Sequence, residues 1–280
     1  MRRLTTILFL TFCFYNLIAS PQAPDFLIVG KDTVAIYFLP LNKLDTTKQK
    51  EFFHNLNLSN DDINISVNLW RGYQAFWKLE DDKLYLVGIK SCPNSDKILE
   101  STFTNSYVNG KVFANWFSSY LAIAKDKILK WDGVFSRTYF KEDILEFRNG
   151  VLTNRKQVNN YIDLENGISR LDKKVVTDTI FYKINQLNWE KLSNCGCDDK
   201  YEITINEKGK IGKIATVPLF DTKKENDEYA LEQKKCIKKF KKQLKDLQFD
   251  IIKWNGNAYQ EKFIFEIFYT VDNKLENWTE

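Results

Sequence analysis

Few residues in this chain of 280 could carry nucleophilic or general-base chemistry. His54 is the one histidine, so a Ser-His-Asp or Cys-His catalytic set would have to include it. It falls in a segment that we expect to be a short helix, where a solvent-facing position is the simpler interpretation. The sequence also contains no Walker A loop, no dinucleotide-binding glycine pattern and no Gly-x-Ser-x-Gly motif. We therefore expect a protein that is not an enzyme and has no catalytic residue and no cofactor.

Adjacent carboxylates are the other catalytic candidates. Glu80-Asp81-Asp82 and Glu142-Asp143 both fall in segments that we expect to be turns. The paired acids of a glycosidase must flank a sugar-binding cleft, and a sequence alone does not show one. Solvated turns are the simpler interpretation.

The cysteines offer disulfide or metal chemistry. Cys195-Gly196-Cys197 is the most metal-like cluster, but structural zinc takes two ligand pairs and only one is present, so we expect no metal site. In an oxidising compartment four cysteines allow three disulfide connectivities, which the sequence leaves open, and Cys236 could instead be a small buried hydrophobe. The possible disulfide residues are Cys195, Cys197, Cys92 and Cys236.

The N-terminus has the composition of a secretory signal peptide, which we place at residues 1–23. A basic start at Arg2 and Arg3 precedes an apolar stretch that ends near Leu17, and small residues follow. That stretch is too short and too polar for a good membrane span, and we find no second one. We therefore expect an exported protein of the periplasm or cell envelope, without an integral membrane span after signal removal. An N-terminal anchor that is never cleaved is the alternative.

Charge argues against nucleic acid as a partner. Lys and Arg number 41 and Asp and Glu 37, a net charge of only +4. The lysines do cluster on a helix that we expect over residues 226–247, with Asn226 as its cap. Such a run is most simply the solvated face of an amphipathic helix; binding of anionic lipid or acidic polymers is the alternative.

The hydrophobic pattern predicts an α+β protein. An N-terminal antiparallel β-rich domain at residues 25–160 would precede a linker at 161–176 and a small two-layer α/β module at 177–272, in the order helix-β-β-helix-β-β. Alternating segments predict three hairpins in the first domain: 72–79 with 84–89, 112–123 with 128–131, and 143–148 with 151–157. The third is joined by Asn149-Gly150, the strongest short-range hairpin signal.

Residues 178–270 resemble the TonB C-terminal domain superfamily. The residues that carry the resemblance are the hairpin Glu207-Lys208-Gly209-Lys210-Ile211, the helix with Leu231, Ile237 and Phe240, Leu247-Gln248-Phe249, the Trp254-Asn255-Gly256 turn and the final strand from Phe263 to Phe268. Asp250-Ile251-Ile252 replaces a common Pro-Ala, and the family's Tyr-Pro motif and Pro-rich spacer are missing. Energy transduction to outer-membrane transporters is therefore not expected. The resemblance implies an envelope module that contacts proteins, with a strand able to pair with a partner's strand.

These observations favour a non-enzymatic envelope protein that binds an unidentified envelope protein. The expected partner-binding residues are Phe263, Phe265, Ile267 and Trp254. Aromatic side chains of the N-terminal domain could add to that surface. Two alternatives stay open: an exported hydrolase that acts on cell-wall or glycan material, and a toxin-immunity or inhibitor protein.

Overall fold

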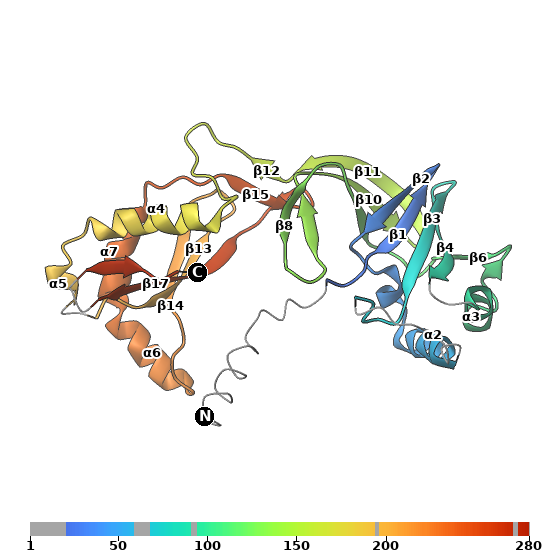
Figure 1. The fold of residues 1–280 in the computed structure, drawn as a ribbon, viewed down its shortest axis with the longest axis horizontal. Coiled ribbons are helices and arrows are strands. Elements are labelled where there is room, and N and C mark those ends of the chain that lie inside the picture. The colour runs from blue at the N-terminus through green and yellow to red at the C-terminus, as the bar shows by residue number, and fades with distance from the viewer. Residues whose placement is uncertain (1–20, 59–67, 91–93, 194–195, 271–273, 280) are drawn as a thin grey trace, which may run out of the picture. The chain divides into compact units, whose positions relative to one another are not determined.

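The computed structural model of the protein describes residues 21–58, 68–90, 94–193, 196–270 and 274–279 (Figure 1). Most of the expected signal peptide lies outside these residues, as do Cys92 and Cys195. The described chain is mixed α+β, with six α-helices, about 39% strand and several sheets, none closed into a barrel. It divides into two compact units, Met1–Gln157 and Val158–Glu280.

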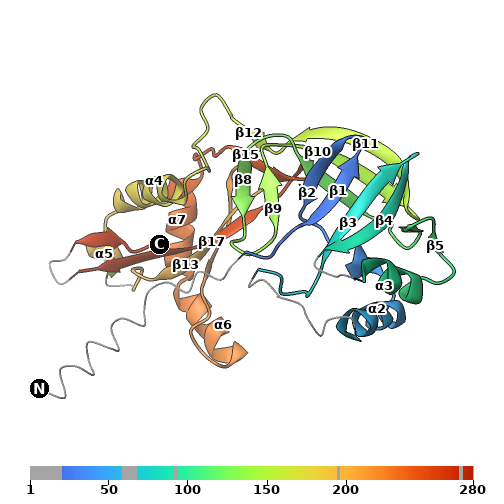
Figure 2. The same ribbon diagram turned by 45° about the vertical axis from the view of Figure 1, so that its right-hand side comes forward.

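The first unit is built on one long sheet. Its strands run in the order β2-β1-β3-β4-β11-β10-β7, and β5 and β6 extend it beside β4. Figure 2 shows β1 to β4 side by side, with β10 and β11 curving behind them. The strands are β1 (Asp25–Val29), β2 (Asp32–Ile36), β3 (Gln74–Glu80), β4 (Lys83–Lys90), β5 (Tyr107–Val108), β6 (Lys111–Phe113), β7 (Tyr120–Ala124), β10 (Lys141–Arg148) and β11 (Val151–Asn159).

One strand pair departs from the expected antiparallel pattern. β1 and β3 are parallel, because the chain passes through η2 (Pro40–Lys43) and α2 (Thr46–Leu58) before it returns to the sheet. Phe52 of α2 and Leu99 of α3 (Ser95–Thr102) pack with the strands in one continuous core. The large side chains at its centre include Trp77 and Phe117, both fully buried.

Two of the three expected hairpins form, and the second expectation is wrong. β3 pairs with β4, and β10 lies beside β11, joined by Asn149 and Gly150 with φ of 49° and 75°. However, β7 pairs with β10, while β8 (Ile128–Trp131) pairs with β9 (Arg137–Tyr139). The cause is Asp132, whose carboxylate accepts three backbone N–H groups, from residues 134 to 136, and so turns β8 onto β9.

A buried carboxylate fixes the start of β1. Asp25 is fully buried and accepts hydrogen bonds from the Trp77 Nε1, the Ala75 N–H and the Arg71 Nη1, each at 3.1 Å. Burial raises the pKa of the Asp25 carboxyl, against the opposing effects of Arg71 and the hydrogen bonds. The preceding backbone is tied down too, since Arg71 Nη2 donates to the Ala23 carbonyl at 2.8 Å.

The second unit contains a four-stranded antiparallel sheet with the strand order β14-β13-β17-β18. Its helices supply Ile180, Phe240 and Leu244 to a core that includes Tyr201 and Phe265 of the sheet. The strands are β13 (Lys200–Ile205), β14 (Ile211–Thr216), β17 (Glu261–Tyr269) and β18 (Leu275–Asn277), and the helices are α4 (Lys173–Asn185), α5 (Glu190–Ser193), α6 (Lys223–Glu232) and α7 (Lys234–Leu244).

The single helix expected at 226–247 is two helices that meet at Gln233. The N-cap of α6 is Thr222, whose hydroxyl accepts the Glu225 N–H, and not Asn226 as expected. Asn226 instead holds the preceding loop, since its side chain accepts the N–H groups of Leu219 and Phe220. Both views show α6 projecting away from the sheet (Figures 1 and 2).

The segment expected as a linker, 161–176, belongs to the second unit. β12 (Tyr161–Ile162) pairs with β15 (Ile251–Trp254), which pairs in turn with β16 (Asn257–Ala258). Buried Asp250 holds the segment, because its carboxylate accepts from the Tyr161 hydroxyl at 2.5 Å and the Leu164 N–H at 3.0 Å. A polar sequence with one glycine therefore marks a packed loop here rather than a spacer.

None of the helices in the described part of the chain combines the length and apolar character needed to cross a bilayer.

Candidate functional site

The residues expected to bind a partner do not form one surface. Phe265 and Ile267 are fully buried, and Phe263 is partly buried against the same core. They lie on β17, which pairs with β13 along residues 261–266 and with β18 along residues 267–269. Trp254 is exposed but belongs to β15, in a different sheet. The alternating pattern had identified residues that share a face, and that face is turned towards the helices.

The strand that the structure leaves at an edge is β14. Val217 N–H donates to the Lys200 carbonyl, so these two residues form a hydrogen-bonded pair of the antiparallel ladder. Because such pairs alternate, the backbone N–H and C=O of Thr216 and Ile214 point away from β13.

The pairing of β13 with β17 gives the same outward orientation for the backbone groups of Thr216. Ile267 N–H donates to the Asp199 carbonyl, so the backbone groups of Tyr201, which lies opposite Thr216, are directed to β17. In the described part of the chain, Ile214 and Thr216 have no hydrogen-bond partner on the outer side. These backbone groups are available to a further strand.

The chain that follows β14 exposes large apolar side chains. Leu219 is 53% exposed and Phe220 is 48% exposed, although Asn226 fixes the backbone of both. Phe220 also contacts the ring of Tyr229 at 5.9 Å between centroids. A fixed loop that presents apolar side chains next to a strand without an outer neighbour is a candidate contact surface for a protein.

The opposite edge of the sheet is enclosed along residues 266–269 of β17. β18 has only three residues, and the Asn277 side chain donates to Asp178 of α4 at 3.0 Å. Beyond it, Trp278 N–H donates to the Glu266 carbonyl and the Trp278 ring packs on Phe268. The candidate site is therefore β14 with the loop at residues 217–222, which we call the β14 edge.

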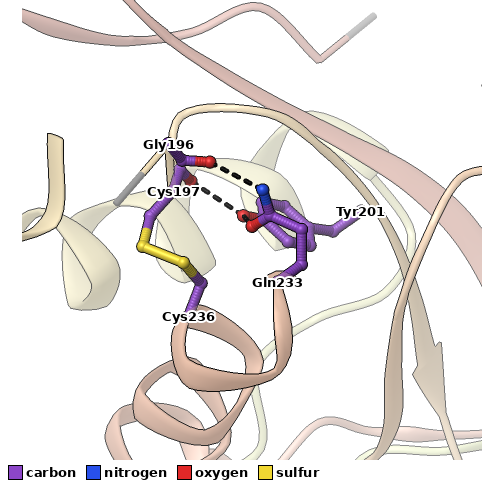
Figure 3. The surroundings of a disulfide bond; sticks show 5 residues. All are labelled: Gly196, Cys197, Tyr201, Gln233 and Cys236. Carbon is purple, nitrogen blue, oxygen red and sulfur yellow. Dashed lines mark hydrogen bonds between the residues drawn. A yellow bond between two sulfur atoms is a disulfide. The ribbon is translucent and has the colours of Figure 1, made fainter. Parts of the chain in front are cut away.

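A disulfide supports this part of the unit (Figure 3). Cys197 and Cys236 are joined and fully buried, so the Cys197 thiolate is not available as a metal ligand. Beside the bond, Gln233 Nε2 donates to the Gly196 carbonyl at 2.9 Å. The bond thus ties the loop before β13 to α7, which packs near β14.

The catalytic candidates are spread over the first unit. His54 is exposed on α2. Glu80 is ion-paired with Lys111 and Lys78, and the hydrogen bond from Lys111 contributes most to lowering the pKa of Glu80 to about 2. Glu142 lies at the start of β10 rather than in a turn. It is buried there, and its carboxylate accepts the Tyr139 N–H at 2.9 Å.

A cavity of about 310 Å³ in the first unit is lined by two acidic residues. Asp32 and Asp143 line it together with Lys125, Arg155 and Lys156. Asp143 is already engaged, since Lys125 Nζ lies 3.1 Å from its carboxylate and Gln157 also donates to it. The carboxylate of Asp143 is therefore held by two side chains that line the same cavity.

The fold and this geometry define a two-unit α+β protein whose second unit presents a sheet edge. Compared with known protein families, with curated proteins and with solved structures, the chain gives no match.

Proposed function

We propose that this protein is an exported, non-enzymatic protein of the cell envelope that binds another protein through its second unit, a module similar to the TonB C-terminal domain. The partner adds a strand along β14. The observation that carries the proposal is the outward orientation of the backbone groups of Ile214 and Thr216, on an edge with which no other strand of the described chain pairs. Strand addition uses such groups for affinity and neighbouring side chains for specificity.

The apolar loop supports the same mode of binding. Leu219 and Phe220 lie just beyond the end of β14, where the side chains of an added strand would meet them. Their burial would add to the main-chain hydrogen bonds. The two other classes considered, a hydrolase and a toxin-immunity protein, have no observation that favours them over strand addition.

The test substitutes the residue whose N–H points outward. Thr216→Pro removes a donor from the free edge without removing a bond to β13, whereas Thr216→Val keeps the N–H and changes only the side chain. The full chain, carrying a photo-crosslinking residue at Lys213, is expressed in the source cells. We expect a specific envelope crosslink that Thr216→Val retains and Thr216→Pro abolishes, while both variants keep their circular dichroism spectrum. A crosslink that survives Thr216→Pro unchanged contradicts strand addition along β14.

A further inference from the structure

The solvent side of α7 consists almost entirely of lysine. Cys236, Phe240 and Leu244 are buried, and their four-residue spacing places them on one side of the helix. The other directions are occupied by Lys234, Lys235, Lys238, Lys239, Lys241, Lys242 and Lys245, which we call the α7 lysine face.

Six of these lysines form no salt bridge with a described residue, unlike other lysines of the same unit. On the outer face of the sheet, Lys200 lies 3.0 Å from Glu266 and Lys262 lies 3.1 Å from Glu202. By contrast, no carboxylate among the described residues forms a salt bridge with Lys238 or with five other members of the α7 lysine face: Lys234, Lys239, Lys241, Lys242 and Lys245. Lysines three and four residues apart repel one another, so this helix is less stable than its core contacts alone would make it. A bound anionic surface would relieve that repulsion.

An exposed apolar side chain lies at the N-terminal border of this basic surface. Leu231 is 67% exposed and precedes Lys234 and Lys238 by three and seven residues, the spacing of one helix face. The two helices meet at Gln233, whose N–H donates to the Tyr229 carbonyl and whose carbonyl accepts the Ile237 N–H. Leu231 therefore lies where α6, which carries the exposed Asp227 and Glu228 one turn earlier, meets the α7 lysine face.

This combination favours a lipid surface over a dissolved polyanion. Lysines beside an exposed leucine match the interfacial pattern, in which the charges contact anionic headgroups and the apolar side chain enters the boundary with the acyl chains. A polyphosphate or nucleic acid would engage the lysines and leave Leu231 in water. The apolar side of α7 is occupied by the protein core, so the contact would be peripheral.

We propose that the α7 lysine face, together with Leu231, binds the surface of a membrane that contains anionic phospholipid. The site is separate from the β14 edge and does not depend on the function proposed for it. Binding is electrostatic in its larger part, and it holds the second unit against the bilayer without insertion of a helix.

The test measures co-sedimentation of the full chain with two kinds of vesicle, phosphatidylcholine alone and phosphatidylcholine mixed with phosphatidylglycerol. We expect binding only to the second kind, and its loss when salt is raised from about 0.1 M to about 1 M, because the screening length falls from about 10 Å to about 3 Å. Lys238→Glu with Lys242→Glu should weaken binding by about tenfold or more. The matched control, Lys50→Glu with Lys97→Glu, makes the same charge change on exposed lysines of the first unit and should bind as the wild type does.

Leu231→Asn separates the lipid surface from a soluble polyanion. It changes no charge, so it should reduce vesicle binding several-fold and leave any binding of inorganic polyphosphate unchanged. Equal binding to both kinds of vesicle overturns the proposal. So does an equal loss in the Lys50 and Lys97 control, or binding of polyphosphate without binding of vesicles. Thermal unfolding of each variant shows whether its fold is retained.

Discussion

The hydroxyl of Tyr201 lies 3.1 Å from the side-chain oxygen of Gln233, the residue at which α6 ends and α7 begins, and donates to it. The same hydroxyl lies 2.9 Å from the Cys197 carbonyl. Burial raises the pKa of Tyr201, so the phenol remains a proton donor over the ordinary pH range. The contact joins β13, the disulfide loop and the helix junction at one buried point, and it gives the lysine-rich α7 a fixed starting position.

Removal of the disulfide should destabilise the second unit. Cys197 and Cys236 are 39 residues apart, and closing a loop of that size stabilises the folded state by about 4 kcal/mol in the chain-entropy description. We expect the double variant Cys197→Ala and Cys236→Ala to lower the free energy of unfolding by about 2–4 kcal/mol in denaturant titrations. A reductant should shift the wild type and leave the double variant unchanged. An unshifted wild type under full reduction would show that the bond contributes little.

Loss of the buried carboxylate at the start of β1 should destabilise the first unit strongly. Asp25→Ala leaves the Arg71 guanidinium, the Trp77 indole N–H and the Ala75 N–H without their acceptor. Breaking a buried ion pair in this way costs about 3–5 kcal/mol. The control is Asp32→Ala, an exposed aspartate, which should change the unfolding free energy by less than about 0.5 kcal/mol. Equal values for the two variants would contradict the role given to Asp25.

The ion pairs of Glu80 predict a pH dependence. The pKa of Glu80 is lowered to about 2, first by Lys111 and then by Lys78, so the folded state releases this proton more readily than the unfolded state. The stabilisation is present above the ordinary glutamate pKa, near 4.3, and is lost as the pH falls through 2. The stability difference between wild type and Glu80→Gln should therefore be constant near neutral pH and vanish in acid. Urea titrations at a series of pH values measure it, and a difference that persists unchanged in acid would contradict the contribution of these ion pairs.

Local signals in the sequence predicted local structure. The Asn149-Gly150 turn forms as expected because both residues adopt the positive φ that a two-residue hairpin requires. The missed turn at Asp132 also had a local signal, in Asp132-Gly133, since an aspartate readily accepts the N–H groups that follow it. Features of this kind depend on a few consecutive residues, so they can be read without knowledge of the fold.

Strand order could not be predicted in the same way. The alternation of Phe263, Phe265 and Ile267 indicates one apolar face, but it does not say whether the strand lies inside a sheet or at its edge. That depends on pairing between β17 and β13, which are about sixty residues apart in the chain. For the same reason β14, the candidate edge, carried no distinguishing pattern of its own.

The hairpin between β13 and β14 offers a test of close packing. A Cβ added to Gly209 would lie 2.1 Å from the Phe249 carbonyl oxygen, and its φ is +71°, whereas Gly30 has a similar φ of +62° and open space around it. Both Gly→Ala variants incur the cost of a left-handed backbone, about 1 kcal/mol, but only Gly209→Ala must also displace backbone. We expect Gly209→Ala to lower the unfolding free energy by about 1–3 kcal/mol more than Gly30→Ala in denaturant titrations. Equal losses would show that Phe249 does not pack against the hairpin. They would also show that this contact does not support the start of β14.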